Sequence, residues 1–317
     1  MHFPVSGVDV FPAIPIIVAF VISFFTSMGG VSGAFLLLPF QVSVLGFTSP
    51  AVSPTNLVYN IVAIPSGVYR YIKEKRMAWP LSLVIIAGTL PGVFFGVIFR
   101  IRYLPDPKNF KFFVGCVLFY IAARLLYDLT PKAGALKKKT NALEERFKER
   151  STQIRAQSET GAVGHVAVRT VRFSPINYTY EFYGETFSFN PIILFVLTFA
   201  VGFVGGAYGI GGGSIIAPFL IAIFRLPVYT IAGSTLLATF LTSIFGVTFY
   251  TIIAPLYAHT GLAIAPDWKL GILFGIGGLL GIYSGARLQK YFPAKAIKLI
   301  LGVIILFLSV RYIIQIF

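Results

Sequence analysis

Long apolar stretches alternate with short polar ones along most of this chain, and glycines interrupt two of the apolar stretches. The run at 192–224 contains the break Gly205-Gly-Ala-Tyr-Gly-Ile-Gly-Gly-Gly-Ser214, and residues 11–46 surround a milder break at 28–33. Each arm of the earlier break has only about 12 to 17 residues, whereas a membrane-crossing helix needs roughly 20. We therefore expect a re-entrant hairpin or two short half-helices there.

Three full-length membrane spans are expected after the first break, at residues 51–71, 79–99 and 112–127. A basic loop at 70–76 and a short loop at 100–111 separate them. The second span carries glycines at a spacing of four, a stripe that lets two helix backbones approach closely. We interpret this stripe, Gly88, Gly92 and Gly96, as a packing surface.

The segment at 130–190 departs from the membrane pattern. Residues 132–157 are charged and place apolar side chains on one helical stripe, which predicts an amphipathic helix. From His165 to Phe189 the alternation of apolar and polar residues around Gly184 predicts a hairpin or small sheet. About 60 residues are marginal for an independent core. We expect this insert to pack on the membrane part or on a second copy.

The chain is internally duplicated, which divides it into repeats at 1–129 and 191–317 with the insert at 130–190 between them. Adding 179 to a residue number carries the first break onto the second: Gly30 onto Gly209, Gly33 onto Gly212, Pro39 onto Pro218. The same shift pairs Leu57, Gly67 and Tyr71 with Leu236, Gly246 and Tyr250. A shift of 189 pairs Trp79, Gly88, Gly92 and Gly96 with Trp268, Gly277, Gly281 and Gly285. A shift of 187 pairs Lys111, Gly115 and Arg124 with Lys298, Gly302 and Arg311.

Composition places the protein in a membrane. Of its 317 residues 56% are hydrophobic and 12% charged, against about a quarter charged in an average soluble domain. Mean hydropathy is +0.83. The net charge of +15 comes from residues in loops and in the insert. There it is expected to fix orientation and contact anionic lipid head groups, not nucleic acid. We interpret the N-terminus as a retained membrane segment, not a signal peptide.

The distribution of basic residues predicts the topology, because short basic loops favour the cytoplasm. The loop at 70–76 is basic, whereas its repeat equivalent at 251–267 has no Lys or Arg, and the loop at 287–298 is again basic. We expect inverted repeats, with both basic loops and the insert in the cytoplasm. The loop at 100–111, which contains Arg100 and Lys111, would then lie outside and counts against this topology.

The expected fold is an all-α membrane protein of two pseudo-symmetric, inverted repeats. Each repeat is a re-entrant or broken helix hairpin followed by three transmembrane helices. The insert is expected to be a small cytoplasmic α+β unit.

The ionisable residues bear on the chemistry of the site. All 11 acidic residues lie in loops, termini or the insert, whereas cation-coupled carriers commonly keep a carboxylate within the spans. Three scattered histidines suggest no metal cluster. We expect no cofactor, although backbone carbonyls remain able to hold sodium.

Helix starts at the two breaks are the positive features of the candidate site. Glycines 211–213 leave backbone N–H groups free, and a half-helix that begins near Ser214 directs its positive dipole end into the break. Gly33 begins the same arrangement in the first repeat. These features favour an anion.

Small polar residues of the following spans complete the candidate site, because positions four apart share one helix face. The candidate substrate-binding residues are Gly33, Thr55, Asn56, Asn60, Gly211, Gly212, Gly213, Ser214, Ser234, Thr235 and Thr239. The alternative is that the Ser, Thr and Asn side chains only bond neighbouring helices. Arg124 and Arg311, near span ends, are expected to extend to the membrane interface.

The motifs Gly-Ile-Gly-Gly-Gly-Ser at 209–214, Pro218 and Ala-Gly-Ser-Thr-Leu at 232–236 resemble those of the sulfite exporter TauE/SafE family. The resemblance covers both membrane halves, although the first break, Gly-Val-Ser-Gly-Ala, departs from the glycine run. It implies transport, in the direction of export, of sulfite, sulfoacetate or another small sulfur-containing or organic anion across the cell membrane.

The resulting hypothesis is a secondary transporter or facilitator whose anion site lies between the two glycine breaks and which works by alternating access. One alternative is a cation-coupled symporter of another small solute. Another is a membrane sensing or assembly protein that acts through the basic insert, and a homodimer remains open. A membrane enzyme would need converging acid, base or metal groups, and the sequence shows no such convergence.

Overall fold

The computed structural model describes residues 1–29, 31–73, 77–130, 168–174, 176–182, 185–224, 226 and 228–316. Within them, six helical stretches are long and apolar enough to cross a membrane. They are α5 (Trp79–Tyr103), α6 (Pro107–Tyr127), α8 (Pro191–Tyr208), α10 (Val228–Ile253) with its continuation η1 (Ala254–Thr260), α11 (Trp268–Leu288) and α12 (Ala294–Ile314). The chain is therefore a multi-pass membrane protein.

Each glycine break separates two helices. In the first half α1 (Ala13–Gly29) precedes the break and α2 (Ala34–Ser43) follows it, and both are shorter than a full span. In the second half the break separates α8 from α9 (Gly213–Phe224). The equivalent prolines Pro39 and Pro218 lie inside α2 and α9. The prediction of two half-helices at the first break is confirmed.

Two predicted boundaries are wrong. Residues 51–71 do not form one span, because α3 (Val52–Ala63) ends before Pro65 and α4 (Pro65–Lys73) begins there. Proline has no N–H for the helical ladder, and its ring clashes with the preceding turn. The predicted loop at 100–111 is also too long. α5 continues to Tyr103, and α6 begins at Pro107 behind Asp106, whose carboxylate accepts the N–H groups of Lys108 and Asn109.

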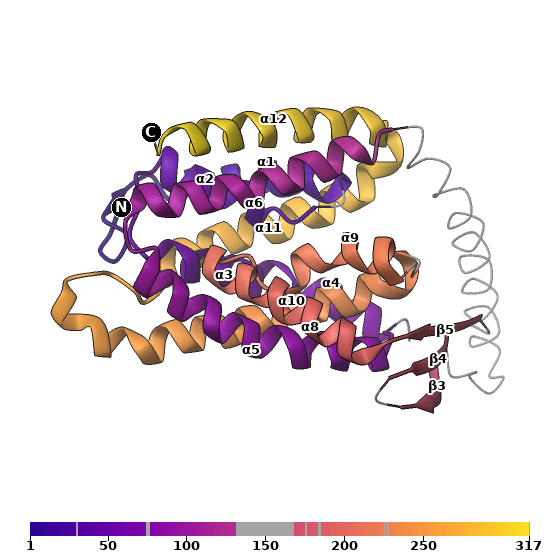
Figure 1. Ribbon diagram of the computed structural model, residues 1–317. Coiled ribbons are helices and arrows are strands. Elements are labelled where there is room, and N and C mark those ends of the chain that lie inside the picture. The colour runs from indigo at the N-terminus through magenta and orange to yellow at the C-terminus, as the bar shows by residue number, and fades with distance from the viewer. Residues whose placement is uncertain are drawn as a thin grey trace.

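The helices of the two halves alternate in the bundle instead of forming separate bodies (Figure 1). α1 packs on α11 as α8 packs on α5, and α6 packs on α12. The glycine stripes make these contacts. A Cβ on Gly88, Gly92 or Gly96 would clash with the carbonyl oxygens of Phe195, Phe199 and Phe203. A Cβ on Gly277, Gly281 or Gly285 would clash with those of Ile16, Phe20 and Phe24, the equivalents under the shift of 179. The packing interpretation of the stripe is confirmed.

The same contacts give the helix directions. The residue numbers of the contacting positions increase together along both helices of a pair. α5 therefore runs parallel to α8, and α11 runs parallel to α1. α11 is also parallel to α3, since Gly271 meets Val58 and Gly275 meets Val62. α6 and α12 are antiparallel, since Gly115 meets Tyr312 and Gly302 meets Leu126.

The described part of the insert is an antiparallel sheet in the order β3 (Val168–Phe173), β4 (Tyr178–Phe182), β5 (Glu185–Phe189). It lies at one end of the helix bundle, and both chain termini lie at the other end (Figure 1). Tyr180 is fully buried, and the ring of Phe189 lies 6.4 Å from that of Phe224 in α9. The sheet therefore packs on the membrane part, as expected. The predicted amphipathic helix at 132–157 lies outside the described residues.

A short N-terminal hairpin, β1 (His2–Phe3) and β2 (Val8–Asp9), was not predicted. Its Ser6 donates backbone and hydroxyl hydrogen bonds to the Asp267 carboxylate, which caps the start of α11.

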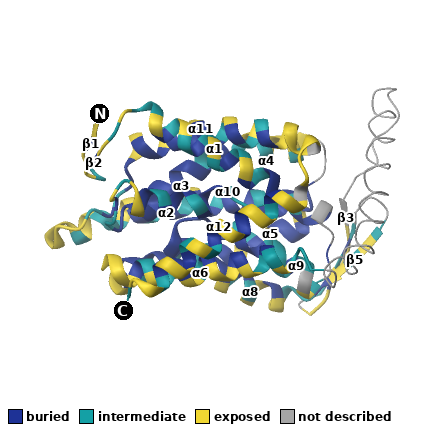
Figure 2. Ribbon diagram, turned by 90° about the horizontal axis from the view of Figure 1, so that it is seen from above, coloured by how far each residue is buried: buried dark blue, intermediate teal, exposed yellow. Residues whose placement is uncertain are grey.

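Buried residues line the facing sides of the helices, and exposed apolar side chains such as Phe307 and Ile300 cover the outside (Figure 2). An outer surface of this kind suits lipid contact.

Candidate functional site

The glycine-rich backbone of the second break is held by two asparagines of α3. Gly209 and Gly211 have φ of +90° and +75°, a conformation that glycine adopts at no steric cost. Asn56 Nδ2 donates to the carbonyl oxygens of Gly209 at 2.9 Å and Ala34 at 3.1 Å, so one side chain joins both breaks. Asn60 Nδ2 donates to the carbonyl oxygen of Ile210 at 3.0 Å.

A cavity of about 570 Å³ lies between the two breaks. Six of the eleven candidate residues line it: Gly33, Asn60, Gly213, Ser214, Thr235 and Thr239. They come from both repeats, through the starts of α2 and α9 and the facing sides of α3 and α10. The fold therefore brings the paired breaks, which are far apart in sequence, to the wall of one cavity.

The other five candidates lie outside the cavity lining. Thr55 Oγ1 accepts the N–H of Asp267 at 2.9 Å, and Ser234 Oγ lies 2.9 Å from Ser82 Oγ. Gly212 donates its N–H to Thr242 Oγ1 at 3.0 Å. Asn56 bonds both breaks as described above, and Gly211 forms the turn of the second break. These residues join helices and shape the breaks around the cavity.

The hydroxyl groups of the cavity wall donate their hydrogens to nearby backbone carbonyls. Ser214 Oγ donates to Ile210 at 2.9 Å, Thr235 Oγ1 to Ala232 at 3.1 Å, and Thr239 Oγ1 to Thr235 at 2.8 Å. The wall therefore presents hydroxyl lone pairs in this arrangement. The N–H groups at the starts of the half-helices add backbone donors to the wall, and within the described residues no group accepts a hydrogen bond from the N–H of Gly213.

Charged side chains line the end of the cavity where α6 ends and α12 begins. Arg124 Nη2 lies 3.5 Å from one carboxylate oxygen of Asp128, and Lys298 Nζ lies 3.4 Å from the other. Arg124 was predicted to extend to the membrane interface, but the structure places it on the cavity wall. The shift of 187 that pairs Arg124 with Arg311 and Lys298 with Lys111 was the sequence signal that pointed to these positions.

A comparison with protein families shows to which family the chain belongs. The family model for sulfite exporter TauE/SafE matches residues 15–312, which is most of the chain. The chain belongs to this family. A TauE/SafE member is a membrane transporter, which is not an enzyme class.

One curated relative shows similarity to this TauE/SafE chain: the probable membrane transporter protein YunE of Bacillus subtilis (strain 168). The two chains are 25% identical over 173 residues, which cover 55% of this chain and 51% of the relative. The match thus spans about half the length of the relative. No solved structure matches the chain.

On the other side of this TauE/SafE protein, buried tyrosines stand at positions equivalent to three residues of the cavity wall. Gly29, Tyr71 and Leu125 line the cavity, and their repeat equivalents are Tyr208, Tyr250 and Tyr312. All three tyrosines are buried.

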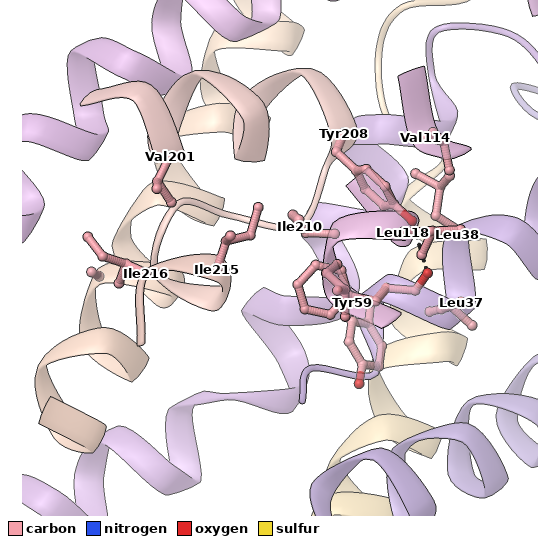
Figure 3. Close-up of a cluster of buried hydrophobic side chains, with 14 of the residues drawn as sticks. Leu37, Leu38, Tyr59, Val114, Leu118, Val201, Tyr208, Ile210, Ile215 and Ile216 are labelled. Carbon is pink, nitrogen blue, oxygen red and sulfur yellow. Dashed lines mark hydrogen bonds between the residues drawn. The ribbon is translucent and has the colours of Figure 1, made fainter. Parts of the chain in front are cut away.

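The hydroxyls of these tyrosines close contacts between the halves and between helices. Tyr208 donates to the carbonyl oxygen of Phe35 at 3.0 Å, and its ring reaches from the end of α8 toward Leu38 and Leu118 (Figure 3). Tyr250 donates to Gly206 at 3.2 Å. Tyr312 lies 2.6 Å from Ser43 Oγ. These contacts tie the tyrosine side together, whereas the equivalent positions on the other side line the cavity.

Proposed function

We propose that this chain exports a small anion, such as sulfite, sulfoacetate or a similar sulfur-containing or organic anion, through the cavity between the two glycine breaks. The observation that carries the proposal is the composition of the cavity wall. The wall contains the starts of α2 and α9, whose dipoles favour negative charge. It also contains Arg124 and Lys298, at the end of the cavity where α6 ends and α12 begins. The acidic residue of this wall, Asp128, already lies within 3.5 Å of both cations.

The helix directions support inverted repeats. α1, α3 and α11 run parallel, as do α5 and α8. α10 runs antiparallel to α3, since Leu57 meets Gly246 while Asn60 donates to Ser243 Oγ. α10 also runs with α5, where Gly246 lies near Val93 and Gly233 near Met77. These directions oppose α1, α3, α5 and α6 to their equivalents α8, α10, α11 and α12, and so support the inverted-repeat arrangement that transporters use for alternating access.

The proposed orientation places the open end of the cavity toward the cytoplasm. Tyr71, Arg124 and Lys298 line this end, and they adjoin the basic loop at 70–76, the insert and the basic loop at 287–298. Short basic loops favour the cytoplasmic side. Of the basic residues at 100–111 that count against this topology, Arg100 belongs to α5 and is fully buried, whereas Arg102 and Lys108 are exposed.

In the proposed mechanism an anion enters past Arg124 and Lys298 and reaches the N-terminal end of α9 at Gly213 and Ser214. The cavity-side contacts then close while Tyr208, Tyr250 and Tyr312 separate from their partners on the other side. The pseudo-symmetry supports this exchange, because the positions equivalent to the three tyrosines, Gly29, Tyr71 and Leu125, line the cavity.

Release of anions from liposomes tests the proposal. The full-length protein is reconstituted into liposomes that are loaded with sulfite, sulfoacetate, sulfate or acetate. The rate of release is compared with that of loaded liposomes without protein, called empty liposomes below. Ser214→Leu adds bulk inside the cavity and should reduce release at least about tenfold, since a packed interior tolerates extra volume poorly. The matched control is Thr248→Leu on the exposed face of the same bundle. Release of every anion at the rate of empty liposomes would reject the proposal.

A further inference from the structure

The charge cluster at the mouth of the cavity contains more cations than its one carboxylate can neutralise. Among the described residues, the charged ones that line the cavity are Arg124, Asp128 and Lys298. Their side chains are 26%, 21% and 21% exposed, so they are partly screened from solvent yet accessible from it. The Asp128 carboxylate contacts both cations through different oxygens, at 3.5 Å and 3.4 Å. A carboxylate thus occupies the position between two cations that an incoming anion would take.

Both ends of the antiparallel pair α6 and α12 carry the same kind of cation pair. The shift of 187 that relates these helices carries Arg124 onto Arg311 and Lys111 onto Lys298. The packing obeys the same relation, because Gly115 lies against Tyr312 while Gly302 lies against Leu125 and Leu126. Lys111 of α6 is therefore placed relative to Arg311 of α12 as Lys298 of α12 is placed relative to Arg124 of α6. Each end has one arginine and one lysine from different repeats.

The two ends differ in one residue. The equivalent of Asp128 under the shift of 187 is Gln315, an uncharged amide at the C-terminal end of α12. Of these two equivalent positions, the one at the cavity side carries an acid and the other does not. The Asp128 side chain is not needed to end α6, since the backbone N–H of Asp128 makes the capping bond to the carbonyl of Arg124.

We propose that Arg124 and Lys298 form an anion-capture subsite at the mouth of the cavity, and that Asp128 is a tethered competitor which the arriving anion must displace. Arg311 and Lys111 form the equivalent subsite at the opposite side, without a competitor. The ligand is a small oxyanion, a sulfite, sulfonate or carboxylate, whose oxygens replace those of Asp128 on the two cations. This inference rests on the proposed function of anion transport.

The subsite follows from the energetics of partly exposed ion pairs. Such pairs are weak, so a carboxylate on the short aspartate side chain, which has two rotatable bonds, exchanges readily with a dissolved anion. An arginine presents a fork of N–H donors that matches an oxyanion, and a lysine adds a mobile point charge. Removal of the competing carboxylate should therefore tighten binding of the anion, whereas removal of the arginine should weaken it.

Binding of sulfite and of sulfoacetate to the full-length protein tests the assignment. The protein is placed in nanodiscs of phosphatidylcholine, which carries no net charge and so does not compete, and binding is measured by calorimetry. For Asp128→Gln, which installs the side chain of the opposite end, the dissociation constant should fall roughly two- to fivefold. For Arg124→Gln it should rise by a similar factor. Both effects should shrink as salt is raised, because partly exposed charges are screened.

Matched variants separate the competitor role from net charge and from folding. Asp9→Asn removes one negative charge from the exposed N-terminal hairpin and should leave the dissociation constant unchanged. Asp128→Asn, a smaller change, serves should the glutamine variant not fold. If Asp128→Gln binds like Asp9→Asn, or more weakly than the unaltered protein, the competitor assignment is wrong although anion transport stands. If the unaltered protein neither binds nor releases any anion tested, the proposed function fails, and this inference fails with it.

Discussion

Leu57 of α3 packs against Gly246 of α10, and a Cβ on that glycine would come within 2.6 Å of Leu57 Cδ1. Their repeat equivalents make the same contact in reverse, with Leu236 against Gly67 at 2.7 Å. The pair of contacts relates the halves at the level of single atoms. The contact of Leu57 with Gly246 also limits how closely α3 and α10 approach each other, and both helices contribute residues to the cavity wall.

Substitution of Gly246 should therefore destabilise the packing of α3 on α10. We expect Gly246→Val to lower the thermal unfolding temperature in detergent, because overpacking of a close contact costs about 1–3 kcal/mol. Leu57→Ala in the same chain should recover part of the loss by making room. If the double variant unfolds at the temperature of Gly246→Val or below, Leu57 is not the group that meets the added side chain.

Gly209 should tolerate substitution least, because two separate costs meet there. It has a φ of +90°, and a Cβ would clash with the backbone of Ser53. Gly7 has a similar φ of +67° but no atom within 4 Å of a Cβ, so Gly7→Ala isolates the conformational cost of about 1–2 kcal/mol. We expect Gly209→Ala to lose folded protein in a size-exclusion assay, while Gly7→Ala keeps most of it. Equal yields of the two variants would contradict the close approach of Ser53.

The glycine breaks, the duplication and the glycine stripes were predictable because each leaves a local signature. Half-helices show as runs too short to span, and close helix contacts show as glycines four apart. The spacing of Gly88, Gly92 and Gly96 and of their equivalents favoured helix packing as their role. The break at Pro65 was equally visible, but the apolar composition of 51–71 outweighed it in the interpretation.

The site itself was only partly predictable. The sequence placed Asn56 and Asn60 on one helix face, yet it did not distinguish the residue that lines the cavity from the one that bonds both breaks. Asn56 Nδ2 meets the carbonyls of Ala34 and Gly209, which lie in different repeats. Arg124 looked like an interfacial residue because it lies near the end of a span, and Lys298, which contacts the same Asp128 carboxylate, is distant in sequence. Which of two equivalent sides is open is a property of the conformation, and the pattern of residues does not encode it.

The tyrosine seal on the closed side predicts a variant that favours opening. Tyr312 OH lies 2.6 Å from Ser43 Oγ and donates to the carbonyl of Pro39 at 3.2 Å. Tyr312→Phe removes these bonds and keeps the ring, which costs the closed arrangement about 0.5–1.5 kcal/mol per bond. We expect faster hydrogen exchange in peptides that cover α2. Tyr103→Phe, whose side chain is exposed, should leave that exchange unchanged. Unaltered exchange in Tyr312→Phe would exclude Tyr312 from the seal.

Substitution of Arg100, unlike that of Gly246 or Gly209, is expected not to destabilise the folded protein and can stabilise it. Its side chain is fully buried, and its guanidinium stacks on the ring of Phe110 at 3.7 Å. One nitrogen donates to the carbonyl of Leu104, whereas Nε and Nη2 have no partner among the described residues.

A buried charge without a counter-ion is costly, and apolar replacements of similar volume are often neutral or stabilising. We expect Arg100→Met to raise the thermal unfolding temperature in detergent or to leave it unchanged, because Met fills the space beside Phe110 without the desolvation cost. Tyr103→Met, on the exposed surface one turn away, controls for the change to Met. A fall in the unfolding temperature of Arg100→Met alone would mean that the guanidinium is satisfied by a partner, such as a bound anion, that stabilises the folded protein.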